Sequence, residues 1–391
     1  MKITGFRHET YLMKMDRAIS DCNQPEGVEL LPGSILFIET DEDISGLGLG
    51  FGGEAIASLF SVIEGQDPRE VLGLWMIMND AVHKGGNEGA ANAALSMIDV
   101  ALWDIKAKIA GEPLWQTLGA SEGRVKAYAS GLDYCLSDED LFVFYRRLAE
   151  TGIDGGKLKV GLDFEADMRR IGIMQDALSI ASDDPVLMID ANEYWSPKQA
   201  IRYVRRIEDK YKIEWVEEPA RRWDYNGLRK VSQQVAASVA TGENLNSIAD
   251  FFPLISNGAV DVANVTTGHS GATGCRQIAN MALGYGIPVS MMNAQANFMA
   301  HVAAALPNHS AMEVVDPGRE HCLTFDNHIE DGFIVLGDSP GLGIEVDEKT
   351  LADLQANPPT GKGTFPLSRR EGAGRYIVPP AAGEVPWRTG K

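Results

Sequence analysis

The chain has 391 residues, of which 45% are hydrophobic and 23% are charged. This composition suits a large folded core and more than one domain, and it excludes a mostly disordered chain. The formal charge is −20, from 35 basic and 55 acidic residues, and the sequence contains no basic run. A nucleic-acid partner is therefore not expected, because nucleic-acid binding needs clustered positive charge.

The sequence predicts neither secretion nor membrane insertion. The four cysteines are far apart and form no CxxC pair, which argues against a disulfide framework or a zinc knuckle. The first residues lack the apolar core of a signal peptide, and no apolar run is long enough to cross a bilayer. We therefore expect a cytoplasmic protein without a membrane partner.

The first part of the chain predicts strands and turns, followed by a helix. Residues 34–40 are rich in strand-forming residues, and residues 46–53 read as a flexible glycine stretch. Residues 86–110 have small and apolar residues at helical spacing, and Gly111 is a suitable stop for that helix.

From about residue 124, short apolar strands alternate with amphipathic helices. Met168, Ile171 and Met174, for example, recur at helical spacing and share one face. The candidate strands are residues 125–129, 156–160, 186–190, 213–217, 237–241, 260–264, 287–291 and 311–315. Eight strands joined by helices predict a parallel barrel, with a doubly wound open sheet as the alternative. Residues 323–336 predict a hairpin that turns at Asp331 and Gly332.

Charged residues gather at the ends of these strands, where barrel enzymes place their catalytic groups. Lys157 and Lys159 are two residues apart on the second strand, so both side chains face the barrel interior. Acidic residues end the next three strands, and they are Asp190, Glu217 and Glu243. Three clustered acids would repel one another. A divalent cation with oxygen ligands, such as Mg²⁺, would relieve the repulsion.

Each motif also has an ordinary structural explanation. A Lys-x-Lys pair is commonly a solvated surface, Glu-Glu-Pro a strand end before a turn, and Asp-x-Asn a loop or a helix cap. The order of the motifs and their spacing of about one strand–helix unit favour a shared site.

In this order the motifs resemble those of the enolase superfamily, in its mandelate racemase-like branch. They are KLK at 157–159, DAN at 190–192, EEP at 217–219 and GEN at 242–244. Residues 94–108 resemble the helical part of the capping domain of that family, and residues 339–348 resemble its closing segment.

The resemblance implies a modified TIM barrel of the (β/α)7β type with an α+β capping domain. The implied division is residues 1–122 for the N-terminal capping domain, 123–316 for the barrel, and 317–391 for a C-terminal segment that returns to the capping domain. It also implies a homo-oligomer. The loops near residues 15–30 and 48–56 are then expected to decide which substrate is bound.

The resemblance also implies roles for the strand-end residues. The implied Mg²⁺ ligands are Asp190, Glu217 and Glu243. Lys159 matches the base that removes the proton next to a substrate carboxylate, and Lys157 matches its electrostatic partner. We expect the charges of Lys157 and the metal to lower the pKa of Lys159, since a lysine base must be neutral. Asn192 and Glu313 match substrate-contacting positions, and Asn293 is expected to bind a substrate hydroxyl or orient a water.

The sequence departs from the racemases of this branch at the sixth and seventh strands. Those enzymes carry an Asp and a His there as a second base, and this chain has no such pair. It also lacks the lysine that the muconate-lactonising branch places at the end of the sixth strand. A racemisation needs a proton donor opposite the base, whereas Lys159 alone can serve both steps of a syn elimination. His269 is a candidate donor, and His83 and Lys84 are candidate contacts for the far end of the substrate.

These observations favour a Mg²⁺-dependent dehydratase that acts on a small hydroxylated carboxylate. A polar site without an aromatic cage suits a sugar acid, which would give a 2-keto-3-deoxy acid. A racemase, epimerase or cycloisomerase of the same superfamily is the first alternative. The second is a metal-binding barrel without catalytic activity.

Overall fold

The centre of the molecule is a closed barrel of parallel strands. The computed structural model describes residues 1–50, 52, 53, 55–365, 367–371, 373 and 374. In this part of the chain eight strands form the ring, and pairing of β11 with β4 closes it. The barrel strands are β4 (Arg124–Ser130), β5 (Gly155–Lys159), β6 (Val186–Asp190), β7 (Ile213–Glu217), β8 (Ser238–Thr241), β9 (Val262–Val265), β10 (Val289–Met291) and β11 (His309–Val314). The predicted barrel is confirmed.

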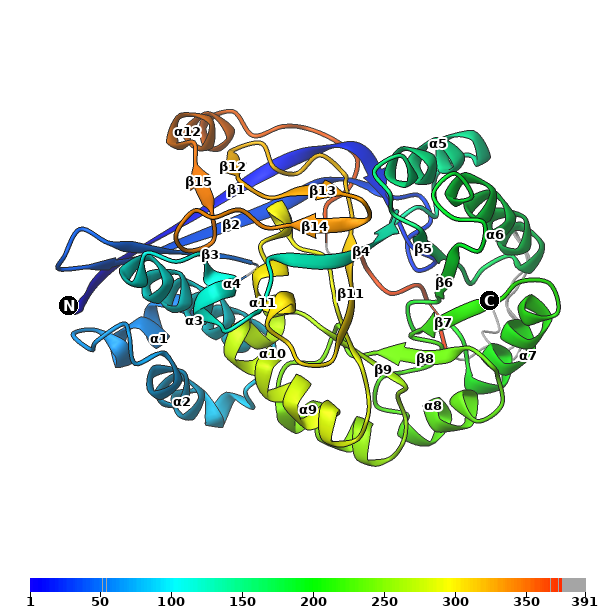
Figure 1. Ribbon diagram of the computed structural model, residues 1–391, viewed down its shortest axis with the longest axis horizontal. Helices are drawn as coiled ribbons and strands as arrows, with labels where there is room; N and C mark the ends of the chain where they lie inside the picture. The colour runs from blue at the N-terminus through cyan, green and yellow to red at the C-terminus, as the bar shows by residue number, and fades with distance from the viewer. Residues whose placement is uncertain (51, 54, 366, 372, 375–391) are drawn as a thin grey trace.

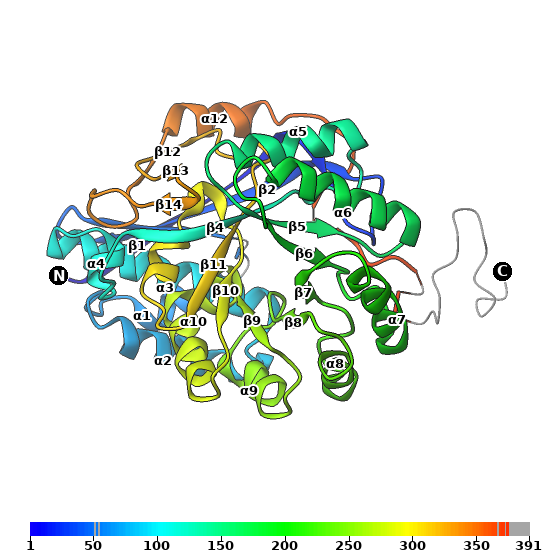
Figure 2. The same ribbon diagram turned by 45° about the vertical axis from the view of Figure 1, so that its right-hand side comes forward.

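Amphipathic helices follow the first seven strands, and several of them can be seen on the outside of the ring in Figure 2. They are α5 (Asp138–Ala149), α6 (Phe164–Leu178), α7 (Pro197–Glu208), α8 (Tyr225–Ser232), α9 (Ile248–Ser256), α10 (Thr267–Gly284) and the short α11 (Ala300–Ala304). Local sequence sets their starts. In α7, for example, Ser196 and Gln199 form a capping box and Pro197 occupies the first turn. After β11 the chain leaves the barrel, which gives the expected (β/α)7β pattern.

The N-terminal segment forms an antiparallel sheet with helices beside it (Figure 1). Its elements are β1 (Ile3–Ile19), β2 (Val28–Thr40), β3 (Ser45–Leu49), α1 (Ile56–Ile63), α2 (Val71–Ala81), the 3₁₀ turn η1 (His83–Gly85), α3 (Gly89–Ala110) and α4 (Leu114–Thr117). Helix α3 is buried along most of its length and packs against both β3 and the barrel helix α10. It therefore joins the capping sheet to the barrel.

The predicted flexible glycine stretch is wrong where β3 forms. Gly46 and Gly48 are buried against α3, and an added Cβ would come within 2.1 Å of the Ala101 carbonyl oxygen and 2.3 Å of the Met97 carbonyl oxygen, respectively. These glycines permit close packing between strand and helix. Residue 51 of the predicted stretch lies outside the described residues.

The C-terminal segment returns to both domains. Strand β12 (Leu323–Phe325) pairs with β15 (Ile344–Val346), and β13 (His328–Glu330) pairs with β14 (Phe333–Val335), which extends the sheet antiparallel to β4. Asp331 and Gly332 have φ values of 50° and 77°, so the predicted turn is confirmed, but the hairpin is shorter than residues 323–336. Helix α12 (Glu348–Ala356) packs against β1. The boundaries at residues 122 and 316 stay predictions.

Among the helices of the described residues, none combines the length and apolar character that a bilayer crossing requires.

Candidate active site

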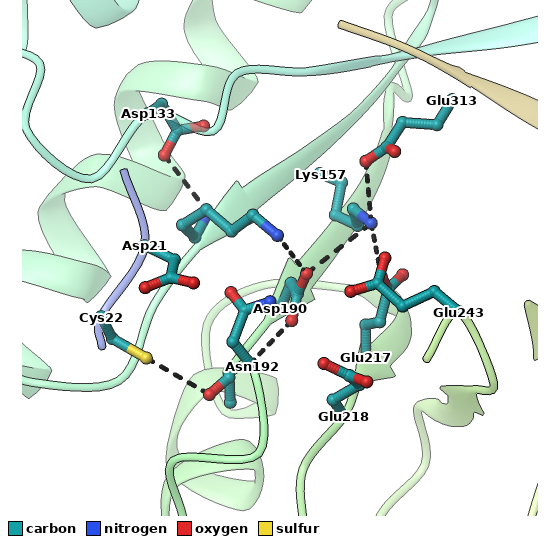
Figure 3. Close-up of polar contacts among 12 residues, drawn as sticks. Asp21, Cys22, Asp133, Lys157, Asp190, Asn192, Glu217, Glu218, Glu243 and Glu313 are labelled. Atoms are coloured by element: carbon teal, nitrogen blue, oxygen red, sulfur yellow. Dashed lines mark hydrogen bonds and ion pairs between the residues drawn. The ribbon is translucent and has the colours of Figure 1, made fainter. Parts of the chain in front are cut away.

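Five of the predicted site residues meet at the ends of four barrel strands. The parallel register places Lys159 opposite Asp190, and Asp190 opposite Glu217. Lys157 comes from the same strand as Lys159, and Glu313 approaches from β11 (Figure 3). All five side chains are buried. The strand ends thus gather both lysines and three carboxylates in one place.

The two lysine amines lie between the carboxylates. Lys157 Nζ lies 2.6 Å from Glu217 Oε1, 3.0 Å from Glu313 Oε1 and 3.7 Å from Asp190 Oδ2. Lys159 Nζ lies 2.5 Å from Asp190 Oδ2. The Lys-x-Lys motif is therefore not a solvated surface pair. Both ammonium groups compensate buried negative charge.

The electrostatics of the lysines differ from the prediction. Burial by itself lowers the pKa of Lys159, but the adjacent Asp190 carboxylate raises that pKa above its ordinary value overall. The pKa of Lys157 is also raised, because Glu217 and Glu313 outweigh its burial. Lys157 acts in the expected direction and lowers the pKa of Lys159, but Asp190 outweighs it. The expected effect of the metal charge stays a prediction.

The remaining acids leave an excess of buried negative charge. Glu218 and Glu243 accept hydrogen bonds from Asn244 Nδ2 at 2.9 and 3.3 Å. Burial raises the pKa of Glu217, Glu218 and Glu243, and Glu217 Oε2 is buried without a hydrogen-bond partner. Oxygen-rich acids with unmet charge suit a hard divalent cation. Within the described ranges, however, no three His, Cys, Asp or Glu side chains are already arranged to hold a metal ion.

The predicted substrate-contacting residues lie at the same end of the barrel. Asn192 has a φ of 40°, its N–H donates to Asp190 Oδ1 at 2.8 Å, and its Oδ1 is buried without a hydrogen-bond partner. Asn293 Nδ2 donates to Glu313 Oε2 at 2.5 Å. The buried Arg319 donates from Nη1 to Asn293 Oδ1 at 2.8 Å. Sequence reasoning missed Arg319, because it lies in a loop after β11 with no motif around it.

A cavity of about 360 Å³ opens above these residues. Its barrel side includes Lys159, Asn192, Glu243, Asn293 and Glu313. From the two loops predicted to decide substrate choice, the cavity is lined by Met15, Ile19, Asp21, Asn23, Leu49 and Gly50. The barrel loops also contribute apolar side chains, which include Leu132, Met292, Phe298 and Met299. The expectation of a polar site is therefore met only in part.

The histidines that the sequence singled out fall on different surfaces. His269 lines the cavity, and burial lowers its pKa. His83 and Lys84 lie in η1, where both are exposed, and neither lines this cavity.

The capping-domain carboxyl of Asp21 was missed, although it lines the cavity and burial raises its pKa. Its signal in the sequence was only its position in a loop expected to bind substrate.

Comparison with known families gives two matches. Residues 34–119 match the model of the mandelate racemase/muconate lactonizing enzyme N-terminal domain. Residues 143–350, more than half of the chain, match the enolase C-terminal domain-like model.

Several enzymes are similar to this chain over most of its length. The 3,6-anhydro-alpha-L-galactonate cycloisomerase of Streptomyces coelicolor is 29% identical, covering 81% of this chain and 90% of that enzyme. The L-talarate/galactarate dehydratase of Salmonella typhimurium is 30% identical, covering 83% of each. The hydrophobic dipeptide epimerase of Enterococcus faecalis is 32% identical, covering 61% of this chain and 67% of that enzyme. The three names describe three different reactions.

Solved structures agree with the fold. A racemase from Streptomyces coelicolor with bound magnesium superposes with a TM-score of 0.82 at 27% identity, covering 90% of this chain and 99% of that chain. L-Talarate dehydratase from Polaromonas, complexed with Mg and L-glucarate, gives a TM-score of 0.81 at 28% identity, covering 90% and 96%.

Proposed function

The chain belongs to the mandelate racemase/muconate lactonizing enzyme family, and on that premise we propose that Lys159 removes the proton next to a substrate carboxylate. Elimination of water from the β-carbon of a hydroxylated acid then follows. The observation that carries this proposal is the position of Lys159, which contacts Asp190 at the floor of a cavity surrounded by buried acids.

We propose that Asp190, Glu217 and Glu243 hold Mg²⁺. Their oxygens, the burial of Asp190 and Glu217, and the unmet negative charge support this assignment, and so do the magnesium-bound structures of similar proteins. When bound, the ion supplies positive charge that stabilises the anion formed by proton removal.

The proton steps use groups of the chain itself. Lys159, as the neutral amine, takes the α-proton and becomes an ammonium. In a syn elimination the same ammonium returns that proton to the departing β-hydroxyl, and the resulting enol tautomerises to a 2-keto-3-deoxy acid. Lys157 is fully buried and does not line the cavity, but it adds a second ammonium beside Glu313, and its charge would favour a substrate carboxylate bound nearby. His269, which also lines the cavity, is the alternative proton donor.

Racemisation, epimerisation or cycloisomerisation is the second candidate function. A cycloisomerase and an epimerase are about as similar in sequence to this chain as a dehydratase is. This similarity favours the second candidate. The lack of an Asp–His pair after the sixth and seventh strands favours elimination over racemisation, because inversion needs a donor on the opposite face.

Incubation with a library of hydroxylated acids in D₂O and Mg²⁺ tests the proposal. Formation of a keto acid with loss of water supports dehydration. Deuterium at the α-carbon or an isomeric product, in either case without loss of water, favours the second candidate function over dehydration. Neither outcome with any acid would contradict both candidate functions.

A further inference from the structure

A segment near the C-terminus lies against the loop that covers the barrel. We call this segment, residues 361–365 and 367–371, the C-terminal strap. The Glu29 N–H donates to the Lys362 carbonyl at 2.8 Å, and the Phe365 N–H donates to the Leu30 carbonyl at 3.1 Å. The backbone of the strap therefore pairs with the start of β2. The strap also lies beyond the region that either family model matches.

Side-chain contacts continue this attachment towards the barrel. The Ser368 N–H donates to Gln24 Oε1 at 3.2 Å, and the Arg370 N–H donates to Asn23 Oδ1 at the same distance. Asn23 Nδ2 in turn donates to the Asn192 carbonyl at 3.0 Å. The strap, the capping loop and the turn after β6 thus form one connected layer.

An ion pair fixes the strap to the barrel. The Arg369 guanidinium contacts the Glu193 carboxylate and donates to the Glu193 carbonyl at 3.2 Å. Glu193 is buried, has a φ of 54°, and directly follows Asn192. Arg222 also donates to Glu193, at 2.6 Å. Because Glu193 belongs to a constrained turn beside the cavity, this pair holds the strap over the cavity.

Three strap side chains line the cavity itself, and they are Phe365, Leu367 and Arg369. Phe365 and Leu367 also pack against the main hydrophobic core, so their positions are supported from behind. The capping sheet adds Ile19 at the end of β1 and Leu31 of β2 to the apolar lining. Together these residues add apolar lining from outside the barrel to that of the barrel loops.

We propose that the C-terminal strap is part of the substrate site and determines which acids the enzyme accepts. Phe365 and Leu367 form a wall against the part of the substrate that carries no carboxylate, and the Arg369–Glu193 pair holds this wall in place. The substrate class that fits is a hydroxy acid with a ring or another apolar surface, in preference to a fully extended polyol acid. This inference rests on the proposed function and deepens it.

The test compares Phe365→Ala and Arg369→Ala with the matched control Arg370→Ala in the full-length protein with Mg²⁺. The Arg370 side chain is exposed, and alanine keeps the backbone N–H that contacts Asn23. We expect KM for ring-bearing acids to rise about tenfold in the first two variants, with kcat within about threefold. Their preference for ring-bearing over open-chain acids should also fall, and the control should match the unsubstituted protein.

Hydrogen exchange of the strap amides provides a second measurement. Arg369→Ala should speed exchange at the Phe365 amide, and Arg370→Ala should not. Unchanged KM and unchanged substrate ranking in both strap variants would overturn the inference, provided that Lys159→Ala abolishes activity. Full activity of Lys159→Ala would instead overturn the proposed function. If the unsubstituted protein neither converts nor binds any acid, both fail.

Discussion

Asp99 is a buried carboxyl that links the capping domain to the barrel. It lies on α3 and accepts hydrogen bonds from the Thr273 N–H at 2.8 Å and the Thr273 hydroxyl at 2.6 Å, on α10. Trp103 Nε1 donates to the same hydroxyl at 2.9 Å. Burial raises the pKa of Asp99 to about 7, although the Thr273 hydrogen bonds act in the opposite direction. Charging this group near neutral pH therefore opposes folding.

The pH dependence of stability tests this assignment. Because the folded-state pKa is raised, the contribution of Asp99 is fully present below about pH 4 and is lost as the pH rises through about 7. Asp99→Asn should reduce the slope of the unfolding free energy against pH across this range, by at most about 1.4 kcal/mol per pH unit. Urea unfolding at several pH values measures this slope, and Asp184→Asn, at an exposed side chain, is the control. Parallel curves for Asp99→Asn and the unsubstituted protein would refute it.

Among the individual residues of the site, the sequence predicted some and missed others. Lys157, Lys159 and Asp190 could be found because parallel strands align their ends and side chains two apart share a face. Arg319 and Arg369 could not, because each reaches the site from a loop distant in sequence. Their positions depend on tertiary contacts that no local pattern encodes.

Among the elements, the barrel strands were predictable because each is a short apolar run between amphipathic helices. The runs at 186–190 and 213–217 coincide with β6 and β7. Strand β3 was missed because glycine is a poor strand former, and its stability comes from close packing on α3. Tertiary contact therefore outweighed local propensity there.

Substitution of Gly48 tests this explanation of β3. Gly48→Ala should destabilise the protein by about 1–3 kcal/mol, because the added Cβ would press on the Met97 carbonyl. Gly73→Ala is the matched control at an exposed position of helix α2, where nothing lies within 4 Å of the added Cβ. It should be neutral or stabilise by up to about 1 kcal/mol. Denaturant unfolding compares the two, and equal effects would contradict close packing at β3.

On the scale of the whole molecule, three parts of the chain enclose one cavity. The barrel supplies the charged floor, and the capping loop and the C-terminal strap supply the walls. The barrel and the capping helix were predictable from periodicity and the family resemblance. The resemblance also led us to expect that the C-terminal segment returns to the capping domain. The contribution of the strap to the cavity was not predictable, because the segment has no periodic pattern and its path depends on contacts such as Arg369 with Glu193.

Metal binding should stabilise the whole fold if the assigned carboxylates hold Mg²⁺. At about 100 times its Kd, Mg²⁺ should add about 2.7 kcal/mol to the unfolding free energy. Glu217→Gln should reduce this gain, because it removes one ligand charge. Glu214→Gln is the control on the same strand, where the side chain is exposed. Melting temperatures with EDTA and with Mg²⁺ measure the gain, and an equal gain in both variants would argue against Glu217 as a ligand.

The most direct measurement is the rate of α-proton exchange of an accepted acid in D₂O with Mg²⁺, for the unsubstituted protein and Lys159→Ala. We predict that Lys159→Ala slows exchange by about 10²–10⁴-fold and keeps the Mg²⁺-dependent rise in melting temperature. Lys212→Ala, in an exposed pair with Asp184, should exchange at the unsubstituted rate. Exchange by Lys159→Ala at that same rate would contradict Lys159 as the base.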